Sequence, residues 1–142
     1  DAAGREGCGA VLGDKWCAGT WLPRWVEAGV TRNIVLLELF PIVVAFTVWA
    51  HDLANRQVTL WSDNHAEVQM INNNSASCPR VLALLRRLVR CQLEGNIAVH
   101  APHVAGVHNE VPDALSHFQW TRFRMLPRTP NKAPPSRKSC GA

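Results

Sequence analysis

The stretch Leu60-Trp61-Ser62-Asp63-Asn64 decides the fold, because a predicted strand ends and a predicted helix begins within it. Residues 57–61 are β-branched, apolar or aromatic, which is typical of a strand. Residues 65–73 carry apolar side chains at helical spacing. Asp63 therefore lies at a strand end, where carboxylates of α/β sheets project into the crevice that binds ligands. The alternative is a helix N-cap, which Asp favours because it accepts a backbone N–H.

Composition and charge limit the class of protein and the number of domains. The chain has 142 residues, 47% hydrophobic and 18% charged, which predicts one globular domain with a real core rather than a disordered chain. Residues 1–118 hold nine Lys or Arg against eleven Asp or Glu, a balance of −2. Residues 119–142 hold six basic residues and no acid. Such a segment is typical of polyanion contact and equally of a solvated linker.

The five cysteines carry no metal-binding pattern. None forms a CxxC pair, and no His stands at zinc-finger spacing from two of them. Scattered cysteines in odd number favour a reducing, intracellular compartment, either cytoplasm or nucleus. The most apolar run, residues 34–50, is short for a membrane span and is interrupted by Glu38 and Pro41, so we expect a buried helix and no membrane partner.

The predicted elements alternate between strands and helices, which defines an α/β fold class. Turn residues, prolines and hydrophobic periodicity set the boundaries. They predict a strand pair at 8–12 and 15–22, a loop at 24–33, a helix within 34–53, a strand at 57–61, helices at 65–73 and 79–93, a strand at 97–104 and a helix at 109–118. Residues 119–142 are predicted to be a basic, Pro-rich tail or flexible linker, which leaves residues 1–118 as the domain.

Glu38 lies inside the apolar helix. A lone carboxylate there is costly unless it is paired or bound to a metal. Because Pro41 would break an interior turn, we expect the helix to begin near Leu37, with Glu38 in its first turn. A favourable charge at the N-terminal helix dipole is the competing explanation, worth about 0.3–1 kcal/mol.

The helix at 79–93 divides into two faces. Leucines and valines occupy one side, and arginines occupy an arc on the other; these are Arg80, Arg86, Arg87 and Arg90. A solvated face explains this arc, and so does a stripe that contacts phosphates, because Arg pairs with phosphate oxygens through two hydrogen bonds. We take Arg86, Arg87 and Arg90, with Asn64 and Asn109, as candidate nucleic-acid contacts.

Four carboxylates stand at element ends: Asp1, Glu38, Asp63 and Asp113. Pro112 marks a first helical turn, which puts Asp113 near a helix start. Carboxylates without Cys or His at ligand spacing suit hard ions such as Mg²⁺ or Mn²⁺. Two such ions ~3.5–4 Å apart activate a water and stabilise the leaving oxygen of a phosphodiester. The ordered set of four predicts a catalytic centre of this kind.

Residues 1–118 resemble the type 1 ribonuclease H family, and most closely the domains that follow a reverse transcriptase in DIRS-type retroelements. The resemblance lies in Asp1-Ala-Ala-Gly, Glu38-Leu-Phe-Pro-Ile, Ser62-Asp63-Asn64 and the run from Gly106 to Ser116, with Asn109 four residues before Asp113. It implies a five-stranded mixed sheet flanked by helices, with the first strand truncated here. It implies hydrolysis of the RNA strand of RNA–DNA hybrids with two Mg²⁺ or Mn²⁺ ions, beside an upstream reverse transcriptase domain of the same polyprotein.

The chain departs from this family pattern. Strand residues precede the first acid in the family, whereas Asp1 opens this chain, so we expect the 142 residues alone to be poorly stable and weakly active or inactive. Pro112 replaces a small residue. His108 stands only five residues before Asp113, so it is not equated with the loop histidine of cellular enzymes. The alternative for His103 and His108 is that they cap or line the sheet edge. Ile34 and Val35 do not match the family's substrate asparagines.

Three functions remain open from the sequence. The first is an endonuclease acting on RNA–DNA hybrids. The second is an inactive nucleic-acid-binding module of the same fold. The third, an integrase-like strand-transfer domain, usually needs three acids rather than four, and Glu38 on the first long helix disfavours it.

Overall fold

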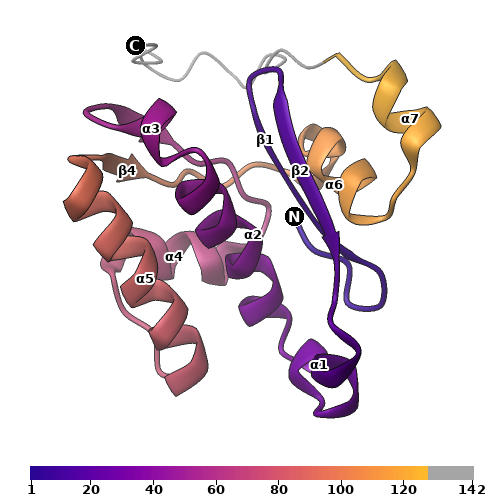
Figure 1. Cartoon of the computed structure of the whole chain (residues 1–142), viewed down its shortest axis with the longest axis horizontal. Helices are drawn as coiled ribbons and strands as arrows, with labels where there is room; N and C mark the ends of the chain where they lie inside the picture. The colour runs from indigo at the N-terminus through magenta and orange to yellow at the C-terminus, as the bar shows by residue number, and fades with distance from the viewer. Residues whose placement is uncertain (128–142) are drawn as a thin grey trace.

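The computed structural model describes residues 1–127 as a mixed α/β arrangement of helices and two small sheets (Figure 1). The strands and 3₁₀ helices are β1 (Gly7–Leu12), β2 (Lys15–Thr20), β3 (Gln57–Thr59), β4 (Ala98–His100), η1 (Val30–Arg32) and η2 (Gly106–His108). The α-helices are α1 (Pro23–Glu27), α2 (Ile34–Val48), α3 (Ala50–Leu53), α4 (His65–Asn73), α5 (Pro79–Gly95), α6 (Glu110–Ser116) and α7 (Trp120–Met125).

The predicted strand pair forms an antiparallel hairpin. β1 and β2 pair from Gly7↔Thr20 to Leu12↔Lys15. Gly13 takes a positive φ of 60° in the connecting turn, a conformation that glycine adopts without a Cβ penalty. A short return of the first residues adds the isolated antiparallel bridge Ala2↔Cys8 on the other edge of β1.

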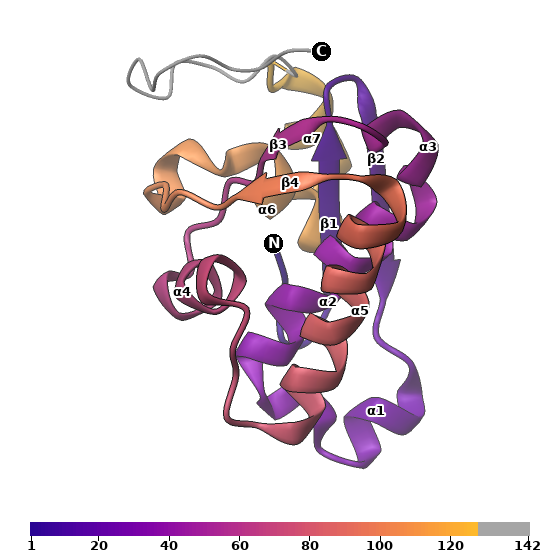
Figure 2. The same cartoon turned by 90° about the vertical axis from the view of Figure 1, so that its left-hand side faces the viewer.

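The second sheet is a parallel pair, and it is separate from the hairpin. β3 pairs with β4 through Val58↔Val99, and the isolated parallel bridge Ser62↔His103 continues their contact. Figure 2 shows β4 crossing the direction of β1. Within residues 1–127 the strands therefore form two two-stranded sheets, and the expected single five-stranded sheet is not seen. Both β3 and β4 are shorter than the sequence predicted.

Helix α2 occupies the centre, between the hairpin and α5 (Figure 1). It begins at Ile34, not near Leu37, because the Asn33 side chain caps it by accepting a hydrogen bond from Leu36 N. Pro41 lies inside the helix and removes one of its hydrogen bonds. The other turns of α2 and its burial in the core compensate for that bond. The expected start was therefore wrong, and Glu38 lies in the second turn rather than the first.

The other helical boundaries also differ from expectation. The apolar run breaks at Trp49, so that α3 is a separate short helix. The predicted loop at 24–33 instead contains α1 and η1. Pro23 stands in the first turn of α1, where its fixed φ suits a helix and its missing N–H costs nothing.

The main core lies between α2 and α5. Leu39 and Leu88 are fully buried in it, and Leu85 and Phe46 are nearly so. The arginine arc of α5 faces outward, as the periodicity predicted: Arg80, Arg86, Arg87 and Arg90 are exposed. The division of α5 into two faces is therefore confirmed.

The expected linker is wrong for the residues that form α7. Phe123 is buried at 2% exposure among α6 residues, and Trp16 of β2 packs edge-on against it at 5.3 Å between ring centroids. Burial of an aromatic ring outweighs the ordering cost of so short a helix. The rest of the predicted tail, residues 128–142, lies outside the described residues.

No helix among residues 1–127 has the length and apolarity needed to cross a membrane.

Candidate metal centre

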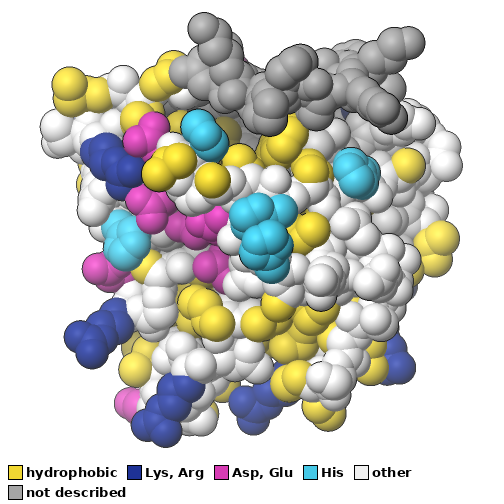
Figure 3. Space-filling model, turned by 180° about the vertical axis from the view of Figure 1, so that it is seen from behind, with side chains coloured by type: hydrophobic (Ala, Val, Ile, Leu, Met, Phe, Trp, Pro, Cys, Tyr) yellow, Lys and Arg dark blue, Asp and Glu magenta, His cyan; other side chains and the backbone are white. Residues whose placement is uncertain are grey.

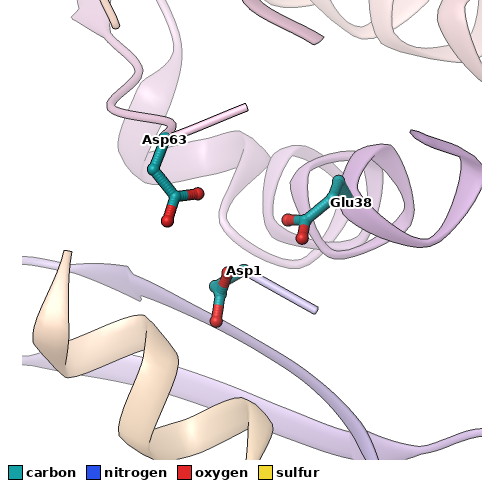
Figure 4. Close-up of side chains that lie close together, drawn as sticks. All are labelled: Asp1, Glu38 and Asp63. Carbon is teal, nitrogen blue, oxygen red and sulfur yellow. The ribbon is translucent and has the colours of Figure 1, made fainter. Parts of the chain in front are cut away.

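Three of the four expected carboxylates come together. Oxygen atoms of Asp1, Glu38 and Asp63 all lie within 4.8 Å of one another. Figure 4 shows the three side chains converging from the chain start, from α2 and from the segment between β3 and α4. Residues far apart in sequence thus share one small volume.

Asp1 is held in place by the hairpin and by α6. Its amino group donates to Gly9 O at 2.9 Å, and its carbonyl accepts from Gly9 N at 3.0 Å, the reciprocal pair of an antiparallel strand. The Ser116 hydroxyl lies 2.8 Å from Asp1 Oδ2 and 2.9 Å from Asp113 O. These contacts fix both the backbone and the carboxylate of Asp1.

Glu38 is the buried member of the group, at 7% exposure. Burial raises the pKa of its carboxyl to about 7, against the favourable charge of the Asp1 amino group. The negative charges of Glu67 and Asp63 raise this pKa further. A cation in the group would favour the ionised form, because it neutralises the charges that now oppose ionisation.

Asp63 is free of the capping role that competed with a functional one. Asn64, not Asp63, is the N-cap of α4, and its Oδ1 accepts from Glu67 N at 3.1 Å. A Cβ added at Gly106 would lie 3.2 Å from Asp63 Oδ2, so a glycine there leaves room for this carboxylate. The N-cap explanation for Asp63 is therefore wrong.

Asp113 does not join the group. Its Oδ2 lies 2.6 Å from Arg122 Nη1 of α7, and His117 Nε2 lies 3.7 Å from Oδ1. Arg122 also lies 3.9 Å from Glu110. Of the four expected ligands, Asp113 is thus the one that the structure pairs with a basic side chain.

The candidate nucleic-acid residues are spread over several elements. Asn109 is buried at 6% exposure and lines the same cavity as the acids, whereas Asn64 is engaged as a helix cap. Arg86 and Arg87 are exposed on α5, and Arg90 pairs with Glu94 at 2.8 Å. The structure does not gather these five residues in one place.

The acids line one cavity of about 410 Å³. Its walls include apolar side chains of α2 and the strand β3, and its lining also holds Glu67. Figure 3 shows acidic side chains gathered beside histidines on this face of the molecule. The cavity therefore combines an apolar wall with a concentrated negative charge.

His103 and His65 lie beside Asp63. His103 Nε2 lies 3.1 Å from Asp63 O, and its ring stacks on His65 with centroids 3.6 Å apart. His103 thus supports the backbone beside the acid, at the edge of the parallel pair. His108 is exposed in η2 and lines the cavity.

Glu67 is the residue that the sequence interpretation missed. It is buried at 1% exposure in α4 and lines the cavity; the Ser62 hydroxyl donates to its Oε2. Its other oxygen, Oε1, is buried without a hydrogen-bond partner among the described residues. The sequence signal was a Glu three residues after the cap Asn64, but an ordinary capping box explains the same pattern.

The donor set fits a hard divalent cation. All three clustered side chains offer carboxylate oxygens, the ligand type that Mg²⁺ and Mn²⁺ prefer. An acidic cluster alone is common on protein surfaces, but the unpartnered buried oxygen of Glu67 beside it is not.

Comparisons with protein-family models, with curated proteins and with solved structures gave no match to this chain.

Proposed function

We propose that this protein is a metal-dependent nuclease of the ribonuclease H type, which hydrolyses the RNA strand of RNA–DNA hybrids during reverse transcription of a retroelement. The observation that carries the proposal is the convergence of Asp1, Glu38 and Asp63, which come from three separate elements. The motif resemblance in the sequence supports the same assignment, including the ribonuclease H-like fold.

In this proposal Asp1, Glu38 and Asp63 hold Mg²⁺ or Mn²⁺. When bound, a pair of such ions supplies an activated water and stabilises the leaving oxygen of a phosphodiester. The chain's own residues orient the ligands: Ser116 fixes the Asp1 carboxylate, and the glycine at Gly106 leaves space beside Asp63. Apolar side chains of α2 line one wall of the cavity beside the acids.

Asp113 is the fourth ligand in the proposal. It reaches the centre only after it exchanges the guanidinium of Arg122 for a cation. Both side chains are more than a third exposed, so solvent screening makes their pairing weak and its exchange inexpensive.

In this proposal, basic and polar side chains contact the substrate. Arg86 and Arg87 are exposed for contact with phosphates, and Asn109 lines the cavity. Arg90 is available once it leaves Glu94, an exposed pairing of small energy. The proposed partners are the hybrid and a reverse transcriptase domain of the same polyprotein, in the cytoplasm or nucleus.

A second candidate function is an inactive nucleic-acid-binding module of the same fold. The observation that favours it is the ion pair between Asp113 and Arg122, which occupies one expected ligand. In this alternative the acids no longer support chemistry, and the basic side chains alone provide binding.

One assay separates the two functions. Because the 142 residues alone are expected to be weakly active or inactive, the chain is first extended before Asp1 by about six strand-forming residues. It is then incubated with a labelled RNA–DNA hybrid and Mg²⁺, beside Asp63→Asn and the matched control Asp14→Asn, whose side chain lies exposed near the hairpin turn. The nuclease predicts cleavage by the unaltered chain and by Asp14→Asn, and none by Asp63→Asn. Hybrid binding without cleavage by any of the three would favour the inactive module.

A further inference from the structure

We propose that Glu67 is a positioning residue of the metal centre: its buried carboxylate fixes the backbone around Asp63 and presents Oε1 to a water on a bound divalent cation. The inference rests on the proposed metal centre, and it does not depend on which substrate the protein cleaves. Glu67 itself is not among the three side chains whose oxygens lie within 4.8 Å of one another, so its place is beside the ligands.

The first argument is the cost of the unpaired oxygen. Glu67 is 1% exposed, and its Oε1 has no hydrogen-bond partner among residues 1–127. A buried acceptor that lacks a partner is expensive, and native structures rarely keep one without a reason. Because Glu67 lines the same cavity as Asp1, Glu38 and Asp63, a hydrated cation there would supply the missing partner.

The second argument is the network that encloses Asp63. The Ser62 hydroxyl donates to Glu67 Oε2 and accepts from Asn64 N at 3.1 Å. The Glu67 N–H in turn donates to Asn64 Oδ1 at 3.1 Å. Residues on both sides of Asp63 are thus tied to Glu67, and the direction of the Asp63 side chain depends on them.

The third argument excludes the ordinary role of a Glu at this position. In a capping box, a Glu three residues into the helix accepts from the backbone N–H of the cap residue. Here that N–H, on Asn64, donates to Ser62 Oγ instead. The Glu67 carboxylate is therefore not used for capping, and its second oxygen remains for another partner.

Electrostatics agree with this geometry. Burial raises the pKa of both Glu38 and Glu67. The charge of Glu67 raises the pKa of Glu38 further, and the charge of Asp63 raises the pKa of Glu67 further. Three mutually repelling carboxylates around one cavity are unfavourable until a cation enters.

The test measures Mn²⁺ binding rather than activity. The free Mn²⁺ signal in electron paramagnetic resonance gives the affinity of the full chain, of Glu67→Gln and of the surface control Glu94→Gln. Gln keeps the volume and an acceptor for Ser62. Loss of an outer partner of a metal centre typically weakens affinity by 10–100-fold, so we expect about tenfold for Glu67→Gln and no change for Glu94→Gln.

A second variant protects the test against misfolding. Should circular dichroism show that Glu67→Gln does not fold, Ser62→Ala removes only the hydroxyl that orients the carboxylate, and we expect it to weaken Mn²⁺ binding several-fold. Affinity within about twofold of the unaltered chain in a folded variant, with only the melting temperature changed, would make Glu67 merely structural. Failure of the unaltered chain to bind Mn²⁺ would also overturn the inference. Mn²⁺ binding without hybrid cleavage would overturn the nuclease alone.

Discussion

Arg122 Nη1 lies 2.6 Å from Asp113 Oδ2, and Asp113 is the expected carboxylate that stays outside the group formed by Asp1, Glu38 and Asp63. The pairing joins α6 to α7, a helix within the segment that the sequence assigned to a tail or linker. The position of α7 therefore bears directly on whether a fourth ligand is available.

Removing the guanidinium should release Asp113. We expect Arg122→Gln to bind Mn²⁺ several-fold more tightly than the unaltered chain and to cleave hybrid at lower metal concentration, because the carboxylate no longer has to exchange partners. The melting temperature should change little, since the pair is partly exposed. Arg124→Gln, which changes an exposed arginine of the same helix, is the matched control. Unchanged metal affinity would mean that Asp113 is not a ligand.

The raised pKa of Glu38 predicts how stability depends on pH without metal. The pKa of about 7 in the folded chain exceeds the ordinary 4.5, so the folded chain binds more protons than the unfolded chain between these values. The contribution of Glu38 to stability is therefore fully present below about pH 4.5 and is lost as pH rises through about 7, by roughly 3 kcal/mol. Melting temperatures between about pH 5 and about pH 8 measure this.

Glu38→Gln provides the control for that dependence. It cannot ionise, so its melting temperature should vary less across the same pH range than that of the unaltered chain. Saturating Mn²⁺ should also flatten the dependence, because the cation favours the ionised carboxylate. A pH profile that is identical in Glu38→Gln would contradict the assignment.

The residues beyond Pro127 should tune affinity rather than chemistry. A chain ending at Pro127 keeps α7 but loses four positive charges, those of Arg128, Lys132, Arg137 and Lys138. We expect it to bind hybrid more weakly and with a shallower salt dependence, since each phosphate contact contributes a slope of about −0.9. The cleavage rate at saturating hybrid should hold. Equal affinity in the same salt would make this segment a linker only.

An extended segment joined to the amino group of Asp1 should stabilise the protein. Asp1 and Gly9 already form a reciprocal antiparallel pair. Because backbone groups point alternately to the two edges of a strand, the N–H and C=O of Val11 point to the same edge of β1 as those of Gly9. About six residues of alternating polar and β-branched character suffice for one strand. We expect a higher melting temperature and faster hybrid cleavage.

A Gly-Ser extension of equal length is the control for this experiment. It carries the same number of residues but little strand propensity. Amide hydrogen exchange at Val11 should slow with the β-branched extension and not with the Gly-Ser one. Equal melting temperatures and exchange rates for the two would show that no strand forms along this edge of β1.

Local patterns in the sequence determined several elements correctly. The hairpin follows from two short strand patterns around Gly13, and the two faces of α5 follow from its apolar spacing. The junction at Asp63 between strand and helix was also predicted, because β-branched and helical patterns meet there. These features depend on neighbours within one or two turns, so the sequence alone contains them.

Competing local signals explain the errors. The cap at Asn33 determined where α2 begins, although Pro41 indicated a later start. Asn64 took the capping position that Asp63 could also have filled. In both cases two residues satisfy the same local rule, and packing decides between them.

Only the tertiary structure decided how distant residues meet. The meeting of Asp1, Glu38 and Asp63 requires the hairpin, α2 and β3 to pack together, and no local pattern encodes that packing. The burial of Phe123 drew α7 onto the domain, and with it Arg122 onto Asp113. The sequence by itself determined which elements carry the acids. Packing determined which acids share a cavity, because side-chain burial depends on contacts between elements rather than on spacing within one.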